Sequence, residues 1–169
     1  MALWPIAALA QLIRTRQVSS VELTSMYLDR LKRLNPTLNC LVSLTDDLAM
    51  RQARQADAKI AAGRSRGPLH GIPWGCKDII AAPGYPTQLG SSAFAGQVIY
   101  TEATVVRLLR EAGAVLVAKL TTGEIIQGDR WFGDAVAIVV PNLRNSQRRV
   151  NGELAPGLIR GVDLDGDVR

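Results

Sequence analysis

Apolar positions in the first third of the chain recur at helical spacing between residues that begin or end helices. An apolar stretch entered near Pro5 predicts a first amphipathic helix, because proline is tolerated in a first helical turn. The segment Ser19–Glu22 has a capping-box pattern and begins a second helix, which we expect to stop at Asn35-Pro36. An alanine-rich segment over residues 45–63 predicts a third helix that ends at its glycine.

The pattern then changes to short apolar runs that alternate with one helix. Residues 38–44 predict a short strand, and residues 69–77 predict a buried strand that ends near Lys77. A helix follows over residues 101–112 and ends at Gly113, with an inner face expected to comprise Val105, Val106, Leu108, Leu109 and Ala112. The continuous apolar run at residues 114–120 is typical of a strand buried on both faces. This order predicts an α/β domain with some parallel pairing.

The regular pattern ends after Phe132. Residues 133–169 contain no aromatic residue and no clear amphipathic period. We therefore predict two regions, a folded part over residues 1–132 and a tail over residues 133–169.

Composition excludes several classes of protein. The chain has 169 residues, of which 47% are hydrophobic and 21% charged, as in ordinary globular proteins. No stretch reaches the ~18 apolar residues of a membrane-spanning helix. Two cysteines are too few for a disulfide scaffold, and one histidine excludes a His-rich zinc site and Ser-His-Asp chemistry. With no secretory signal pattern and free cysteines, we expect a cytoplasmic protein.

The net charge of +5 raises the question of nucleic-acid binding. Residues 1–132 carry 15 basic and 10 acidic side chains, and residues 133–169 carry 5 of each. The excess is spread along the chain, without a run of five or six like charges. We interpret it as a solvated surface, and nucleic acid is not the expected partner.

Lys77 is the candidate catalytic residue, because it ends an apolar segment beside Cys76 and Asp78. A lysine held in an apolar site loses hydration in its charged form, which lowers its pKa. The neutral amine can then act as a base toward a serine hydroxyl. The alternative is a surface lysine at a strand end, paired with a carboxylate.

Several segments resemble the amidase signature family, whose members hydrolyse or transfer amide groups. Residues 67–78, GPLHGIPWGCKD, resemble its lysine motif, and residues 84–91 resemble its glycine-threonine segment. Residues 103–119 resemble its helix-strand unit, and the helix from Ser20 is similar to its N-terminal region. The resemblance covers roughly residues 5 to 132, with the motifs in the correct order and spacing.

The resemblance implies a fold and a mechanism. The family domain is an α/β/α sandwich around a mixed sheet with N-terminal helices, and this chain would form an incomplete version of it. Its catalytic groups form a Ser–cis-Ser–Lys triad, in which Lys77 matches the base. In the family a Gly/Ser-rich loop carrying the serines follows a Trp-Phe-Gly region. Here Trp131-Phe132-Gly133 leads into a sequence without such a loop, and Ser146 is the only later serine.

We therefore expect an amidase that is truncated before its nucleophile loop and inactive alone, with residues 133–169 divergent through a frameshift or poorly ordered. The alternative is a non-catalytic interaction protein or amidotransferase-like subunit fragment that binds a protein or RNA partner. If the chain is active, its partner is a small-molecule amide. No cofactor, metal or membrane is expected.

The family resemblance also suggests substrate-binding residues in the segment that lines its acyl pocket. These are Thr122, Gly128 and Asp129, although a strand-to-helix turn capped by Glu124 explains the first part of the segment equally well. The sequence Gly90-Ser91-Ser92 is expected to be a small-residue loop rather than a nucleophile site.

Two further residues have both a structural and a chemical interpretation. His70 is expected to order a turn rather than bind a metal. Cys76 beside Lys77 is expected to be a buried, inert thiol, with a lowered thiol pKa as the alternative.

Overall fold

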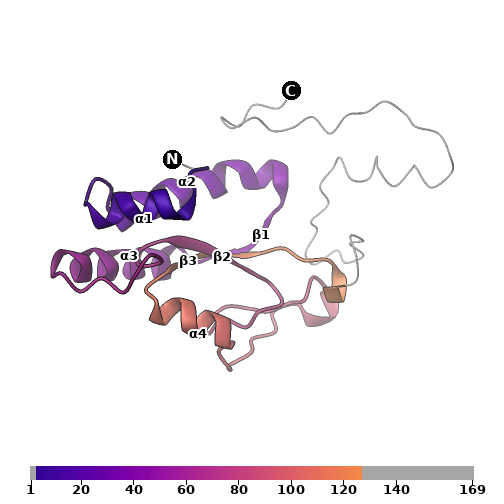
Figure 1. The fold of residues 1–169 in the computed structure, drawn as a ribbon. Helices are drawn as coiled ribbons and strands as arrows, with labels where there is room; N and C mark the ends of the chain where they lie inside the picture. Colours follow the sequence, from indigo (N-terminus) through magenta and orange to yellow (C-terminus); the bar gives the residue numbers. More distant parts are fainter. Residues whose placement is uncertain (1–2, 127–169) are drawn as a thin grey trace.

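The computed structural model describes residues 3–126, which form helices on both faces of a small mixed sheet (Figure 1). The predicted tail, 133–169, lies outside the described residues, so its separation from 1–132 stays a prediction. The elements in chain order are α1 (Ile6–Arg14), α2 (Ser20–Leu38), β1 (Leu41–Leu44), α3 (Asp46–Ala61), β2 (Pro73–Lys77), the 3-10 turn η1 (Ser92–Phe94), α4 (Thr104–Glu111), β3 (Val115–Leu120) and the 3-10 turn η2 (Glu124–Ile126).

The sheet has the strand order β1-β3-β2, with β3 in the centre. Strand β1 runs antiparallel to β3, and β2 runs parallel to it, so the parallel pairing predicted for the strand-helix-strand unit is confirmed. Residues 115–119 of β3 are at most 5% exposed, as expected for a strand buried on both faces. Helices α1 and α2 lie on one side of the sheet and α4 on the other (Figure 1), which confirms the α/β/α class with a mixed sheet.

Helix α3 covers the part of the β3 edge that β1 leaves unpaired. The Thr45 amide and hydroxyl donate to the carbonyls of Val117 (3.1 Å) and Leu116 (2.6 Å). The Leu116 amide donates to the side-chain oxygen of Gln52 at 2.9 Å. Thr45 stands at the N-cap position of α3 but its side chain makes no capping bond there, because its hydroxyl serves the strand. These contacts satisfy backbone groups that would otherwise form an open sheet edge.

The amino terminus of α2 is held by three separate contacts. The predicted capping box is present, with the Glu22 amide donating to the Ser19 hydroxyl and the Glu22 carboxylate accepting from the Ser19 amide. The Ser20 hydroxyl donates to the Gly71 carbonyl at 2.8 Å, and the Asp57 carboxylate accepts from the amide of Ser20 at 2.7 Å. The start of α2 is therefore fixed to α3 and to the loop before β2.

Three sequence predictions need correction. Helix α2 does not stop at Asn35-Pro36 but runs on to Leu38. Pro36 falls in the last turn of the helix, so the backbone hydrogen bond lost through its missing N–H is nearly the final one of the helix. Strand β2 begins only at Pro73 and is partly exposed. On α4, Val106 is buried, whereas Val105 and Leu108 are 44% and 52% exposed, so this short helix packs on the sheet through a narrower stripe than predicted.

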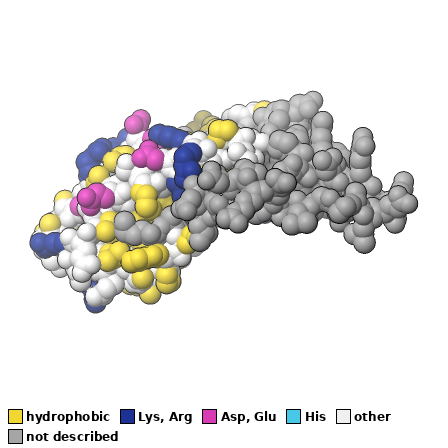
Figure 2. All heavy atoms as spheres, turned by 90° about the horizontal axis from the view of Figure 1, so that it is seen from above, with side chains coloured by type: hydrophobic (Ala, Val, Ile, Leu, Met, Phe, Trp, Pro, Cys, Tyr) yellow, Lys and Arg dark blue, Asp and Glu magenta, His cyan; other side chains and the backbone are white. Residues whose placement is uncertain are grey.

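The described part of the chain contains no helix that is both long enough and apolar enough to cross a membrane. Figure 2 views the face that carries α1 and α2, where basic and acidic side chains are interspersed rather than gathered into one basic area. On this face the charge has the distribution expected of a solvated surface.

His70 orders the turn before β2, as predicted. It is 3% exposed, its Nδ1 accepts from the Arg66 amide at 3.0 Å, and its ring lies against Gly113. Burial, followed by the nearby charges of Arg66 and Lys59, lowers the pKa of His70 below its ordinary value of 6.5.

The lowered pKa of His70 gives the stability of the protein a pH dependence. The unfolded chain binds a proton at this residue before the folded chain does, so stability from His70 is present above pH 6.5 and is lost as the pH falls through the lower folded pKa. We expect the urea midpoint to fall between about pH 7.5 and about pH 5 by more in the wild type than in His70→Gln. Equal falls in the two proteins would contradict this assignment.

Candidate functional site

The carboxyl ends of the parallel strands β2 and β3 bring the candidate residues to one edge of the sheet. Lys77 is in register with Leu120, and the Asp78 amide donates to the Leu120 carbonyl at 2.7 Å. The segment that contains Thr122 follows β3 directly. Ligand sites in parallel sheets commonly form at this edge, so the position is suited to a functional site.

Lys77 itself is exposed, while its neighbours Cys76 and Asp78 are buried. The strand alternation explains this, because consecutive side chains point to opposite faces. The prediction that Lys77 is held in an apolar site is therefore wrong for the described residues. The catalytic role of Lys77 stays a prediction, and its side chain is exposed at the carboxyl end of β2.

The buried lysine of this region is Lys119. Its Nζ lies 2.9 Å from Asp78 Oδ1, and both side chains have no solvent exposure. The same Nζ donates to the Pro86 carbonyl and to the Thr87 hydroxyl, each at 2.9 Å. The other Asp78 oxygen accepts from the Gln88 amide at 2.9 Å. This ion pair fixes the loop at residues 86–88 against the ends of both strands.

The glycine-threonine segment is joined to the chain after β3. The Ile125 amide donates to the Leu89 carbonyl at 2.8 Å, and the Ser91 hydroxyl donates to Glu124 Oε1 at 2.8 Å. A Cβ on Gly90 would lie 2.5 Å from the Thr122 carbonyl oxygen, so this close approach requires glycine. Ser91 is buried and bonded to a carboxylate, which agrees with its interpretation as a structural loop residue.

Of the three predicted substrate-binding residues, the structure describes only Thr122. Thr122 is 1% exposed, and its Oγ1 is buried without a hydrogen-bond partner among residues 3–126. Gly128 and Asp129 lie outside the described residues. The structure thus brings Thr122 to the same sheet edge as Lys77, and the binding role of all three residues stays a prediction.

Cys76 matches the interpretation as a buried thiol. It is 1% exposed, and burial raises the pKa of its thiol above the ordinary value, with a smaller opposing effect from Lys119. The alternative of a lowered thiol pKa is therefore wrong. Cys40 is also a free thiol.

The Asp78–Lys119 pair is the feature that sequence reasoning missed. A signal was present, because Lys119 stands inside an apolar run that predicts burial on both faces. A buried ammonium group needs a partner of opposite charge, and Asp78 follows the parallel neighbouring strand. The sequence thus indicates that Lys119 has a buried carboxylate partner, and the parallel pairing of β2 with β3 identifies that partner as Asp78.

Comparisons with known proteins agree with this geometry. A model of the amidase family matches residues 22–130. A glutamyl-tRNA(Gln) amidotransferase subunit from Coxiella burnetii is 37% identical over 97% of this chain and 36% of the relative, and the corresponding protein from Hahella chejuensis is 42% identical over 93% and 34%. The chain thus spans about a third of the length of these curated relatives.

Solved structures give the same result for the fold. The peptide amidase of Stenotrophomonas maltophilia superimposes with a TM-score of 0.67 at 36% identity, over 73% of this chain and 26% of that one. A fatty acid amide hydrolase superimposes with a TM-score of 0.66 at 25% identity, over 70% of this chain and 21% of that one. Together with the match over residues 22–130, this shows that the chain belongs to the amidase signature family.

Proposed function

We propose that this chain carries Lys77 as the general base of an amidase of the Ser–cis-Ser–Lys type. The observation that supports it is the position of Lys77, exposed at the carboxyl end of β2, beside a loop fixed by the Asp78–Lys119 pair. In the proposed reaction the Lys77 amine acts as the base and takes a proton from a bridging serine, which takes one from the attacking serine hydroxyl. The attacked amide forms an acyl-serine, and the proton returns to the departing amine before water or an acceptor takes the acyl group.

The proposal does not assign the two serines. No Gly/Ser-rich stretch follows Trp131-Phe132-Gly133, so we expect the chain to be inactive alone toward a small amide. The relatives are named as subunits of an amidotransferase, which supports the second candidate, a chain that assembles with a protein partner. Cytoplasmic action remains part of the proposal.

A chimaera tests the role of Lys77 directly. Residues 1–126 of this chain would replace the matching part of the Stenotrophomonas peptide amidase, and hydrolysis of a peptide amide would be measured. We expect the chimaera to be active, its Lys77→Ala variant to lose activity by about 100-fold or more, and its Lys32→Ala variant to keep it. Full activity in the Lys77→Ala variant would disprove the general-base role.

The full chain gives the complementary measurement. We expect no amide hydrolysis above the buffer rate. Hydrolysis that Lys77→Ala abolishes would overturn the expected inactivity and make Ser146 the first nucleophile to test. An inactive chain that captures a defined amidotransferase subunit would support the assembly candidate.

A further inference from the structure

Two adjoining pockets lie away from the Lys77 edge, beside the first residues of β2 and β3. One has a volume of about 360 Å³ and the other about 350 Å³. Both are lined by Leu48, Gln52, Arg110 and Ala114, so they share a wall between α3 and α4. Volumes of this size lie within the range of small-molecule sites.

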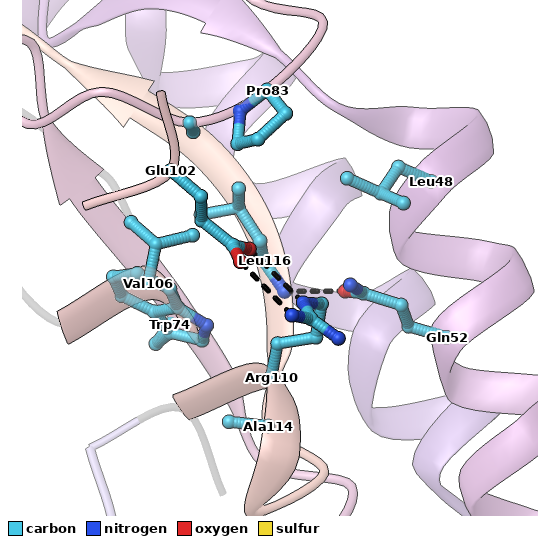
Figure 3. A pocket seen from close by; sticks show the side chains of 10 residues that line it. Leu48, Gln52, Trp74, Pro83, Glu102, Val106, Arg110, Ala114 and Leu116 are labelled. Carbon is cyan, nitrogen blue, oxygen red and sulfur yellow. Dashed lines mark hydrogen bonds and ion pairs between the residues drawn. The ribbon is translucent and has the colours of Figure 1, made fainter. Parts of the chain in front are cut away.

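The first, which we call the apolar pocket, is lined by Trp74, Val106 and Leu116 (Figure 3). In Figure 3 the side chain of Arg110 lies between this apolar side and α3, where Gln52 accepts from the Leu116 amide. The pocket offers an indole ring and branched aliphatic side chains, which suit an aromatic or aliphatic group.

The second, which we call the basic pocket, is lined by Arg51, Lys59, Arg66 and His70. Arg51 and Lys59 both belong to α3, and both line this pocket. Because His70 Nδ1 accepts from the Arg66 amide, the neutral ring carries its proton on Nε2. That N–H has no hydrogen-bond acceptor among residues 3–126, and His70 is one of the residues that line the basic pocket.

Within residues 3–126 no acidic group lines the basic pocket, and three carboxylates of the surrounding elements bind other groups. Glu102 binds Arg110 through two hydrogen bonds of 3.0 and 2.9 Å. Asp57, whose charge acts on His70, accepts the backbone amides at the start of α2. Glu111 pairs with Arg107 on α4.

The cations of the basic pocket are comparatively free. In the described part of the chain, Arg51 and Lys59 form no ion pair. Arg66 uses one nitrogen, Nη1, to bind the carbonyls at the end of α4, which leaves its remaining donors for a ligand. The negative end of the helix dipole often explains a cation near a helix C-terminus. It does not explain Arg51, which stands in the second turn of α3.

We propose that the two pockets together bind a phosphate monoester with an aromatic or aliphatic body. The phosphate would bind Arg51, Lys59, Arg66 and the His70 Nε2–H, and the body would occupy the apolar pocket. Guanidinium and ammonium groups bind phosphate oxygens through charge-assisted hydrogen bonds, and the His70 N–H adds one more donor. This site is independent of Lys77 and of the proposed amidase reaction.

Calorimetry on the full chain tests the proposal with three probes: 1-naphthyl phosphate, 1-naphthol and inorganic phosphate. We expect 1-naphthyl phosphate to bind at least about tenfold more tightly than either half, because one molecule engages both pockets. Arg51→Gln and Lys59→Gln should each weaken its binding by about fivefold, the effect of one charge pair about 4 Å apart in water. Neither should change binding of 1-naphthol.

Arg54→Gln is the matched control, because Arg54 is an exposed arginine of the same helix that lines neither pocket. It should leave the affinity for 1-naphthyl phosphate unchanged. The proposal is wrong if Arg54→Gln weakens binding as much as Arg51→Gln, or if 1-naphthol binds as tightly as the ester. Tighter binding of a short RNA, weakened equally by all three substitutions, would also overturn it in favour of a general polyanion surface.

Discussion

Replacing Lys119 with methionine is expected to lower the free energy of unfolding by about 3–5 kcal/mol. The substitution leaves the Asp78 carboxylate fully buried without its cation. It also removes the ammonium group that donates hydrogen bonds to the Pro86 carbonyl and the Thr87 hydroxyl. An uncompensated buried charge is among the few changes that cost this much, and the size of the side chain is nearly conserved.

Two further variants separate the interaction between Asp78 and Lys119 from the contacts that each residue makes with its surroundings. Asp78→Asn leaves a buried ammonium group and should destabilise the protein by a similar amount. The double variant removes both charges, so its cost should be well below the sum of the two single costs. Urea unfolding of all four proteins gives the interaction free energy from a double-mutant cycle.

A surface pair supplies the control for these measurements. Lys32 Nζ lies 2.6 Å from Asp46 Oδ2, a shorter separation than in the buried pair, but the side chains are 51% and 41% exposed. Lys32→Met should change stability little, because water and salt screen an exposed pair. Additive effects at positions 78 and 119, or a large effect at Lys32, would contradict the importance assigned to burial.

The same contrast explains what the sequence could and could not predict. Local patterns predicted the helices, the capping box at Ser19–Glu22 and the strand at residues 115–120, because each depends on neighbours in the chain. The end of α2 and the exposed side of α4 depend on contacts with other elements, which a local pattern does not contain. The coverage of the β3 edge by Thr45 and Gln52 is a similar case.

The candidate site likewise has features that the sequence predicted and features that depend on the topology. Lys77 was identified from its motif and its place at a strand end, but its exposure depends on which way β2 faces. The partner of Lys119 is 41 positions earlier in the chain, and only parallel pairing of β2 with β3 brings the two together. A lysine in an apolar strand therefore predicts that a partner exists, whereas the topology determines which carboxylate it is.

Substituting alanine for Gly113 is the second change for which we expect a large effect, a loss of about 2–5 kcal/mol in unfolding free energy. Gly113 has a φ of +83°, where a side chain is strained. Its Cβ would also overlap His70 Cδ2 and lie 2.9 Å from Nε2, on a ring that is itself buried. The alanine therefore adds an overpacking cost to the backbone strain.

Gly84 allows these two costs to be measured separately. Its φ is +82°, but an added Cβ there meets nothing within 4 Å. Gly84→Ala should show only the strain, about 1–2 kcal/mol. In a His70→Ala background the overlap is absent, so Gly113→Ala should then cost no more than Gly84→Ala. If Gly113→Ala costs the same with and without the imidazole ring, the ring does not determine the need for glycine at this position.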